Sequence, residues 1–326
     1  MQLLVTGGAG FIGSQLLRHL VTSYPNYKIV CADSLTYAAD YTLIADLEGY
    51  ANYTFIKLDI TELSAVKELF ESHRFTHVIH LAAESHVDNS IKDPLAFVRT
   101  NVVGTLNLLE GARASNKNQA CLFYHISTDE VFGSLGETGS FSENTAYAPR
   151  SPYSASKASS DHFVRAYGET YNLPYIISNC SNNYGPGQHS EKLIPTVISS
   201  VLNSEPIPVY GTGANIRDWL YVEDHVNAID TILHHGHVGE TYCIGGDSEL
   251  SNLELVHLLV DEIDRQLGNA PNTSKALISF VEDRKGHDFR YAIDHSKLTN
   301  DLGWRPSTSL EKGLETTVSW YLNQSK

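Results

Sequence analysis

The chain has 326 residues, of which 42% are hydrophobic and 19% are charged, a composition typical of folded globular proteins. This length is enough for one large domain or two smaller ones, each with a buried core. The formal net charge of −15 argues against a nucleic-acid partner, which requires basic surface, but leaves room for a small anionic ligand held by a few cations.

The first half of the chain alternates short apolar strands with helical patterns. Near-continuous apolar strands separated by helices are typical of parallel βαβ units, whose sheet is covered on both faces. The sequence therefore predicts an α/β fold with a Rossmann-type, doubly wound parallel sheet. The expected strands are residues 3–6, 28–32, 53–58, 77–81 and 120–127, and the expected helices are 11–24, 62–72 and about 94–114.

The pattern becomes irregular after Asn179. Turn-forming residues 182–187 and the Pro and Gly of 205–213 mark loops. Helical patterns return at 222–234, 252–267 and 309–322. We expect a first domain of residues 1–181 plus about 219–246, and a smaller C-terminal α/β domain of residues 182–218 and about 247–326.

The sequence shows no sign of a membrane partner or a metal site. It has no run of about 18 apolar residues, and its first residues predict a strand rather than a signal peptide. The four cysteines, Cys31, Cys121, Cys180 and Cys243, are far apart and lack metal-ligand spacing. We expect a cytoplasmic protein with buried free thiols and no metal.

A glycine-rich turn joins the first expected strand to the first expected helix. Its letters are GGAGFIG at residues 7–13, with the spacing Gly-x-Gly-x-x-Gly from Gly8 and a related spacing from Gly7 through Gly10 to Gly13. Glycine lets the backbone approach a pyrophosphate, whose charge then faces the N–H groups of the helix N-terminus. Such a turn can also use glycine for packing alone.

Asp33 ends the second expected strand, where a carboxylate would accept hydrogen bonds from the adenosine ribose. The same charge repels a 2′-phosphate. Together with the glycine turn, it predicts NAD rather than NADP. Asp59 and Ile60 follow the third strand and are candidates for contact with adenine, although an ordinary strand-end cap is the alternative for Asp59.

Tyr153 and Lys157 lie four residues apart on one face of an expected helix. An ammonium near a phenol stabilises the phenolate, so Lys157 is expected to lower the pKa of Tyr153 and let it act as a base. Ser127 and Thr128 end the preceding strand. After a dinucleotide-binding turn, these features resemble the extended short-chain dehydrogenase/reductase superfamily, in which the Tyr is the base, the Lys assists it and a Ser or Thr hydroxyl bonds the reacting oxygen.

Asp129 and Glu130 directly follow Thr128. Simple hydride transfer does not require two carboxylates here. A reaction that also removes a C–H proton and expels hydroxide needs one base and one acid with separated pKa values. Taken alone, the pair could equally be two solvated loop acids.

Further blocks narrow the resemblance to the dTDP-glucose 4,6-dehydratases, NAD-dependent hydro-lyases of deoxysugar biosynthesis. The resemblance runs from about residue 3 to about 305. Its most diagnostic part is the trio TDE together with the letters RDWL. The blocks are DSLTY at 33–37, AESHVD at 83–88, TDE at 128–130, NNYGP at 182–186, EKLIP at 191–195, RDWLYVEDH at 217–225, GHD at 286–288 and RYAID at 290–294.

This resemblance implies the conversion of dTDP-glucose to its 4-keto-6-deoxy product. Tyr153, assisted by Lys157, would take the proton of the sugar 4-hydroxyl as C4 is oxidised by NAD, and Thr128 would hold that oxygen. Glu130 would remove the C5 proton. Asp129 would protonate the departing C6 hydroxyl, after which hydride returns to C6.

The resemblance also implies that the first domain binds NAD, that the second binds the nucleotide sugar, and that the protein is a homodimer through helices near 95–115 and 152–172. The implied NAD-binding residues are Gly7, Gly10, Phe11, Ile12, Gly13, Asp33, Leu35, Thr36, Asp59, Ile60, Leu81, Ala83, Ser85, Thr100, Tyr153, Lys157 and Asn183. The implied substrate-binding residues are Ser85, Thr128, Asn182, Lys192, Leu193, Pro208, Tyr210, Arg217, Asn252, Arg284, His287 and Tyr291, with Lys192, Arg217 and Arg284 as the candidate phosphate ligands.

The chain departs from the family pattern at several positions, which are Asn89 for Arg, Phe132 for Tyr, Gly187 for an aromatic residue, and Lys285 and Phe289 for Pro and Arg. Those around 187 and 285 adjoin nucleotide-contacting segments, so a UDP sugar stays open as substrate. A nucleotide-sugar 4-epimerase would use the same Tyr and Lys without the two carboxylates. A non-catalytic NAD-binding scaffold is the remaining alternative.

Overall fold

The computed structural model describes residues 1–115 and 121–324 and is built around a seven-stranded sheet. All neighbouring strands in this sheet run parallel. The predicted α/β class with a doubly wound sheet is therefore confirmed. In spatial order the strands are β10 (Thr241–Ile244), β6 (Tyr175–Cys180), β5 (Leu122–Thr128), β4 (His77–His80), β1 (Gln2–Thr6), β2 (Lys28–Asp33) and β3 (Tyr53–Lys57).

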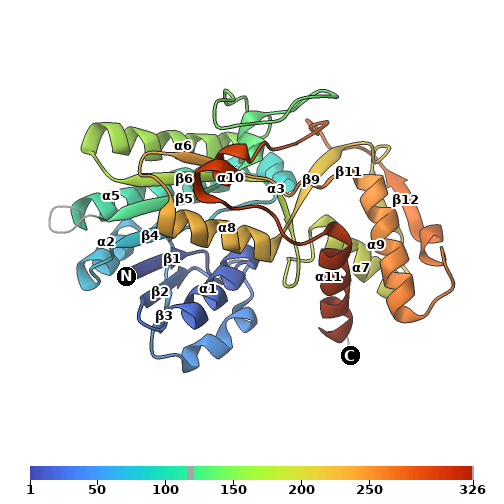
Figure 1. Cartoon of the computed structure of the whole chain (residues 1–326), viewed down its shortest axis with the longest axis horizontal. Coiled ribbons are helices and arrows are strands. Elements are labelled where there is room, and N and C mark those ends of the chain that lie inside the picture. The colour runs from blue at the N-terminus through green and yellow to red at the C-terminus, as the bar shows by residue number, and fades with distance from the viewer. Residues whose placement is uncertain (116–120, 325–326) are drawn as a thin grey trace.

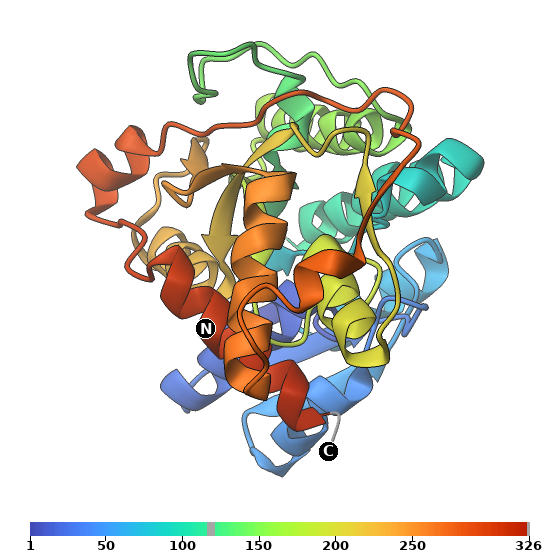
Figure 2. The same ribbon diagram turned by 90° about the vertical axis from the view of Figure 1, so that its right-hand side faces the viewer.

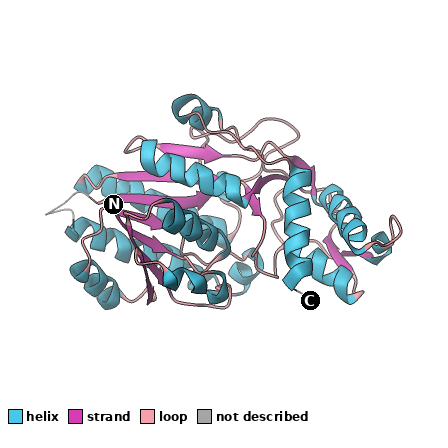
Figure 3. Cartoon of the chain, turned by 60° about the horizontal axis from the view of Figure 1, so that its bottom comes forward, coloured by secondary structure: helices cyan, strands magenta, loops and turns pink. Residues whose placement is uncertain are grey.

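Helices cover both faces of this sheet (Figures 1 and 3). On one face lie α1 (Phe11–Ser23) and α8 (Val222–His235), which join the sheet in one apolar cluster. On the other lie α2 (Leu63–Ser72), α5 (Thr105–Ser115) and α6 (Pro152–Tyr171), which form a second cluster. The strands are apolar on both sides because both sides are covered.

The helix expected over residues 94–114 is divided in the structure. It follows α3 (Val87–Lys92) and consists of α4 (Pro94–Phe97), a π-helical segment Val98–Gly104, and α5. The Asp93 carboxylate accepts a hydrogen bond from the N–H of Ala96 and starts α4. The expected strand 120–127 corresponds to β5, while its first residue, Ala120, lies outside the described residues.

The C-terminal half adds a smaller lobe (Figure 2). Two small sheets and three helices build it, and their buried side chains form a third apolar cluster. The sheets are β7 (Asn182–Tyr184), β9 (Ile216–Tyr221) and β11 (Glu249–Ser251), and β8 (Ile207–Tyr210) with β12 (Ile278–Val281); the helices are α7 (Leu193–Asn203), α9 (Asn252–Leu267) and α11 (Leu310–Gln324). The boundary expected at residues 218 and 219 falls inside β9, and the division into domains stays a prediction.

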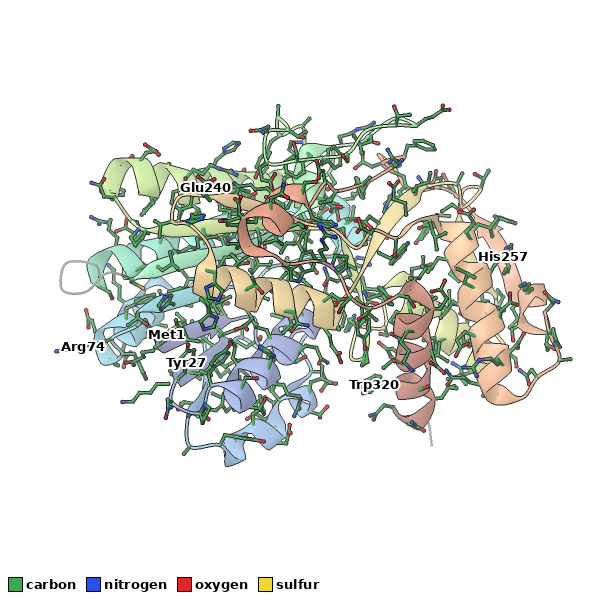
Figure 4. The ribbon with its side chains drawn as sticks, in the orientation of Figure 1. Met1, Tyr27, Arg74, Glu240, His257 and Trp320 are labelled. Carbon is green, nitrogen blue, oxygen red and sulfur yellow. The ribbon has the colours of Figure 1, made fainter. Side chains whose placement is uncertain are left out.

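The two lobes meet at the carboxyl ends of the parallel strands (Figure 1). Arg74 and Tyr27 lie on the sheet lobe, whereas His257 and Trp320 lie on the C-terminal lobe (Figure 4). The short helix α10 (Ser296–Leu302) returns to the sheet lobe and packs beside β10. Ligands of doubly wound sheets bind at the carboxyl ends of the strands, so the junction is where a site is expected.

Candidate active site

A cavity of about 350 Å³ opens at this junction. Its lining combines the glycine turn after β1 and the ends of β2, β4 and β5 with Tyr153 and Lys157 of α6. Asn182, Asn183 and Lys192 line it from the C-terminal part of the chain. The cavity therefore brings together residues that sequence reasoning assigned to the cofactor, to catalysis and to the substrate.

The glycine turn is packed too tightly for side chains. A Cβ at Gly13 would lie 2.1 Å from the Gly7 carbonyl oxygen, and one at Gly7 would lie 2.5 Å from the Ala82 nitrogen. Gly7 also has a φ of +73°, in the left-handed region that favours glycine. Both positions are thus required to be glycine by close backbone approach.

The N-terminus of α1 faces this cavity and suits an anion. Gly10 occupies the N-cap position, and no side chain of the described residues caps that end of the helix. The first N–H groups of a helix have no partner within the helix and carry partial positive charge. The uncapped turn at Gly10, Phe11 and Ile12, all cavity-lining, therefore fits the pyrophosphate of NAD.

Asp33 lines the cavity at the end of β2 and is almost fully buried. Its Oδ2 accepts a hydrogen bond from the N–H of Ala9 at 2.9 Å, and its Oδ1 accepts one from Leu35 at 2.8 Å. Leu35 adopts a positive φ of 56° to make this contact. Leu35 therefore holds Asp33 through its backbone and is not among the cavity-lining residues, while the free lone pairs of Asp33 remain for ribose hydroxyls.

The other residues assigned to NAD surround the same space. Thr36, Asp59, Ile60, Leu81, Ala83, Ser85, Thr100 and Asn183 all line the cavity. They come from the ends of several strands, from the π-helical segment and from β7. Their individual roles stay predictions.

The end of β5 presents the catalytic trio. The Thr128 hydroxyl accepts a hydrogen bond from the N–H of Glu130 at 3.3 Å and donates one to Asp129 Oδ1 at 3.2 Å. It thereby caps the short 3₁₀ turn Asp129–Phe132, which holds both carboxylates at the cavity wall. Asp129 is buried, and its Oδ2 has no hydrogen-bond partner among the described residues.

The two adjacent carboxylates have different electrostatic surroundings. Burial raises the pKa of Asp129 well above its ordinary value, and the charge of Glu130 raises it further. Burial also raises the pKa of Glu130, but Arg217 and Lys192 oppose that shift. A proton shared by the pair therefore belongs on Asp129, which suits an acid beside a base.

Tyr153 and Lys157 lie in the first turns of α6, whose N-terminus carries a reciprocal cap between Ser151 and Ser154. The expected lowering of the Tyr153 pKa is wrong for this structure. Burial raises the pKa of Tyr153 well above its ordinary value and the charge of Glu130 adds to the shift, whereas a hydrogen bond with Thr128 opposes it. The Lys157 ammonium instead donates to the Ile126 carbonyl oxygen at 2.9 Å, which directs one of its hydrogens away from the phenol.

The candidate substrate residues divide into two groups. Ser85, Thr128, Asn182 and Lys192 line the cavity, and the Lys192 ammonium donates to the Ser85 carbonyl oxygen at 3.3 Å. The others lie in the C-terminal part beyond it and are Leu193, Pro208, Tyr210, Arg217, Asn252, Arg284, His287 and Tyr291. For this second group the assignment to substrate stays a prediction.

Within the second group, the two arginines lie over aromatic rings. The Arg217 guanidinium is 4.2 Å from the ring centre of Tyr291, and that of Arg284 is 5.4 Å from the ring centre of Tyr210. The charges of Arg217, Lys192 and Arg284 all lower the pKa of Glu130. The charges of all three predicted phosphate ligands thus act on the catalytic trio, and their binding of phosphate stays a prediction.

Several cavity residues were not identified from the sequence. Glu84, His189 and Glu191 line the wall next to Ser85 and Lys192. Glu191 belongs to a block used to identify the resemblance, so its position next to Lys192 was the available signal. Glu84 likewise belongs to the block at 83–88, next to Ser85, whereas His189 lies in no such block and reaches the cavity only in the folded chain.

The sequence also led us to expect buried thiols, no metal site and no membrane-spanning segment. All four cysteines are buried, and the thiols of Cys31, Cys180 and Cys243 are free. Within the described ranges, no cluster of three or more His, Cys, Asp or Glu side chains is arranged to hold a metal ion. In the same part of the chain, no helix is both long and apolar enough to span a membrane.

Comparison with known proteins agrees with this geometry. The GDP-mannose 4,6 dehydratase family model matches residues 4–317. The chain is 51% identical to the dTDP-glucose 4,6-dehydratase of Xanthomonas campestris pv. campestris (strain B100), over 98% of this chain and 92% of that protein. It is 48% identical to dTDP-glucose 4,6-dehydratase 1 of Escherichia coli (strain K12), over 100% of this chain and 94% of that protein.

Among solved structures, a dTDP-glucose 4,6-dehydratase is also more similar to this chain in sequence than an epimerase is. The crystal structure of the dTDP-glucose 4,6-dehydratase DesIV from Streptomyces venezuelae, with NAD bound, has a TM-score of 0.92 and 42% identity, covering 99% of this chain and 97% of that chain. The UDP-glucose 4-epimerase of Thermotoga maritima has a TM-score of 0.88 but 28% identity, with 100% of both chains covered. The folds agree about equally, and sequence separates the two groups.

Proposed function

Because this chain belongs to the GDP-mannose 4,6 dehydratase family, within the extended short-chain dehydrogenases/reductases, we propose that it uses the cavity at Tyr153 to dehydrate dTDP-glucose with NAD as cofactor. The protein is an NAD-dependent hydro-lyase of this kind. The observation that carries the catalytic assignment is a pair of carboxylates, the buried Asp129 and the half-buried Glu130, which line the cavity with Tyr153 and have unequal tendencies to hold a proton. An epimerase would not need that pair.

The cofactor is held by the glycine turn, Asp33 and Lys157 in this proposal. The uncapped end of α1 receives the pyrophosphate, and Asp33 accepts hydrogen bonds from the adenosine ribose. The chemistry that bound NAD supplies is reversible oxidation, of the sugar at C4 and then in reverse at C6. Side chains of the protein carry out every proton transfer in the reaction.

The first proton is that of the sugar 4-hydroxyl. Tyr153 accepts it, and Thr128 donates a hydrogen bond at the same position. The interaction with Thr128 favours the phenolate of Tyr153, against burial and the charge of Glu130. Lys157, fixed by its bond to the Ile126 carbonyl oxygen, balances the phenolate charge from one turn along α6.

The next step removes water. The 4-ketone acidifies the C5–H bond, and Glu130 takes that proton. As the C5–C6 double bond forms, the C6–O bond breaks, and Asp129 gives its proton to the departing oxygen to make water. After reduction at C6, Glu130 returns a proton to C5, and the 4-keto-6-deoxy sugar leaves.

The nucleotide part of the substrate carries negative charge into an acidic protein. Lys192, Arg217 and Arg284 provide the local cations for its pyrophosphate, since a guanidinium matches the geometry of phosphate oxygens. The negative net charge of the protein affects the pyrophosphate less than these three cations do, because salt screens exposed charges beyond about 10 Å. This assignment is supported by the convergence of all three charges on Glu130.

We also propose a cytoplasmic homodimer. The buried free thiols of Cys31, Cys180 and Cys243 suit a reducing compartment. The dimer interface would use α4, the π-helical segment and α6, whose apolar side chains Leu95, Val98, Val103 and Phe163 are 62%, 44%, 40% and 38% exposed. A pair of such faces would bury this surface. Sedimentation of the purified protein distinguishes a dimer from a monomer.

The deciding experiment is mass spectrometry after incubating the pure protein with dTDP-glucose or UDP-glucose, with and without added NAD⁺. Loss of one water from the dTDP sugar is the expected result, and the UDP reaction measures base preference. An isomer of unchanged mass would indicate an epimerase. Two unchanged sugars, with NAD bound, would indicate a scaffold.

A further inference from the structure

Asp161 lies four residues after Lys157, as Lys157 does after Tyr153, so the three side chains share one face of α6. All three are buried, and Asp161 is completely so. Tyr153 and Lys157 line the cavity, whereas Asp161 lies behind them, outside its lining. A carboxylate without solvent therefore stands one turn from the ammonium that the reaction uses.

Asp161 is held by side chains from three other segments. Its Oδ2 accepts hydrogen bonds from the Ser127 hydroxyl at 2.9 Å, the Tyr147 hydroxyl at 2.8 Å and the Asn179 amide at 3.4 Å. Its Oδ1 lies 3.1 Å from Nε2 of His125. So many donors are unusual for one buried oxygen pair unless the group is ionised.

The charge state of the group follows from these contacts. Burial alone would raise the pKa of Asp161, but the nearby His125 ring, the charge of Lys157 and the hydrogen bond from Tyr147 reverse the shift and lower it. Burial lowers the pKa of His125 to about 4, so at neutral pH this imidazole is uncharged. Asp161 is consequently a carboxylate one helical turn from a cation, whose charge acts on it, with no second fixed charge on His125. The titratable or charged groups around it are Lys157 and Arg165 of α6, His125 of β5, His80 of β4, Tyr147 and Cys180.

Lys157 and Asp161 form hydrogen bonds with consecutive residues of β5. The Lys157 ammonium bonds the Ile126 carbonyl oxygen, and Asp161 bonds the Ser127 hydroxyl. The Asn179 amide, which also reaches Asp161, bonds the Thr128 carbonyl oxygen at 3.0 Å. Three successive residues are thus fixed directly before the two catalytic carboxylates.

We propose that Asp161 is a positioning residue for the dehydration: its buried carboxylate keeps Lys157 charged and holds the end of β5 so that Thr128 and Tyr153 meet the same substrate oxygen. The inference rests on the proposed function. An unpaired ammonium is unfavourable in a buried site, so loss of the carboxylate would favour neutral Lys157. It would also remove the carboxylate oxygen that accepts the hydrogen bond of the Ser127 hydroxyl.

The test compares Asp161→Asn, which keeps the shape of the side chain, with Tyr147→Phe, which removes one hydrogen bond to the same oxygen but keeps the charge. Titration of 13C-labelled lysine by NMR, without substrate, measures the pKa of Lys157, whose signal is identified by its loss in Lys157→Arg. We expect a fall of at least about one pH unit in Asp161→Asn. We expect kcat to fall at least about tenfold, with KM for dTDP-glucose changed less than about threefold.

The pKa of Lys157 should stay near the wild-type value in Tyr147→Phe. An unchanged Lys157 pKa in Asp161→Asn, or an equal fall in both variants, would overturn the proposal. If Asp161→Asn does not fold by circular dichroism, Asp161→Glu takes its place, where retained charge should keep the Lys157 pKa near wild type and a fall of about one unit would contradict us. Wild-type loss of water tests the proposed function separately, since the lysine titration needs no turnover.

Discussion

Arg284 and Asp88 form an ion pair across the junction of the two lobes, with the Arg284 Nε 2.6 Å from Asp88 Oδ1. A second bond joins the Arg284 Nη2 to Asp88 Oδ2 at 2.9 Å, so the guanidinium fork is occupied by one carboxylate. The partners are 196 residues apart in the chain. If Arg284 binds the substrate pyrophosphate, the phosphate oxygens must compete with Asp88 for the same donors.

Asp88→Asn should therefore tighten substrate binding. Removing a carboxylate from a partly buried arginine takes away an attraction of about 1 kcal/mol after screening, which corresponds to a KM for dTDP-glucose lower by about fivefold. Steady-state kinetics measure this. Asp93→Asn is the control, since it removes the same charge from the cap of α4. A raised KM in Asp88→Asn alone would mean that Asp88 positions Arg284 for substrate.

Glu130→Gln should stop the reaction after the first oxidation. The amide cannot accept the C5 proton, so product formation should fall by about 10² to 10⁴-fold. The absorbance of reduced nicotinamide should still rise, and deuterium from solvent should no longer enter C5. Glu137→Gln, in an exposed loop, should behave as wild type. Continued exchange at C5 would assign the base to another group.

Asp129→Asn should remove the acid that protonates the leaving oxygen. Burial and Glu130 raise the pKa of Asp129, so its protonated form persists above the usual range for Asp. Since that form is required, kcat of the wild type should fall as pH rises through the raised pKa. In Asp129→Asn, kcat should be lower by about 10² to 10³-fold and its alkaline limb should move to higher pH. If the alkaline limb of the pH profile of kcat stayed at the same pH in Asp129→Asn, that limb would belong to a different residue.

The sequence was sufficient for elements with strong local patterns. The helix expected at 252–267 coincides with α9, which has a Ser251–Glu254 capping box at its start and Gly268 after its end. By contrast, β6 and β10 were not predicted, since β6 directly precedes the irregular stretch that begins after Asn179, and β10 has only four residues and lies beyond it. Their place in the sheet depends on pairing with strands far along the chain, which periodicity does not reveal.

The site was predictable where one backbone segment defines it. The glycine turn and Asp33 are local features, and the structure brings them to one cavity. The pKa of Tyr153 was not predictable, because it depends on burial and on Glu130, neither of which the spacing to Lys157 reveals. The Asp88–Arg284 pair required both lobes to be in place.

Gly13→Ala should specifically damage cofactor binding. Its Cβ would lie 2.1 Å from the Gly7 carbonyl oxygen and 2.8 Å from the Gly8 Cα, and backbone on both sides leaves little room to adjust. Overpacking of this kind destabilises by about 1–3 kcal/mol, or about 1.5–4.5 °C in Tm for a chain of this size. The turn must also move away from the helix end that receives the pyrophosphate, so the Kd for NAD should rise at least about tenfold. Gly49→Ala is the matched control, because a Cβ there meets nothing within 4 Å, and both its Tm and its NAD affinity should equal those of the wild type. Calorimetric titration of NAD and thermal melting measure the two effects, and normal NAD affinity in Gly13→Ala would show that this close contact does not shape the cofactor site.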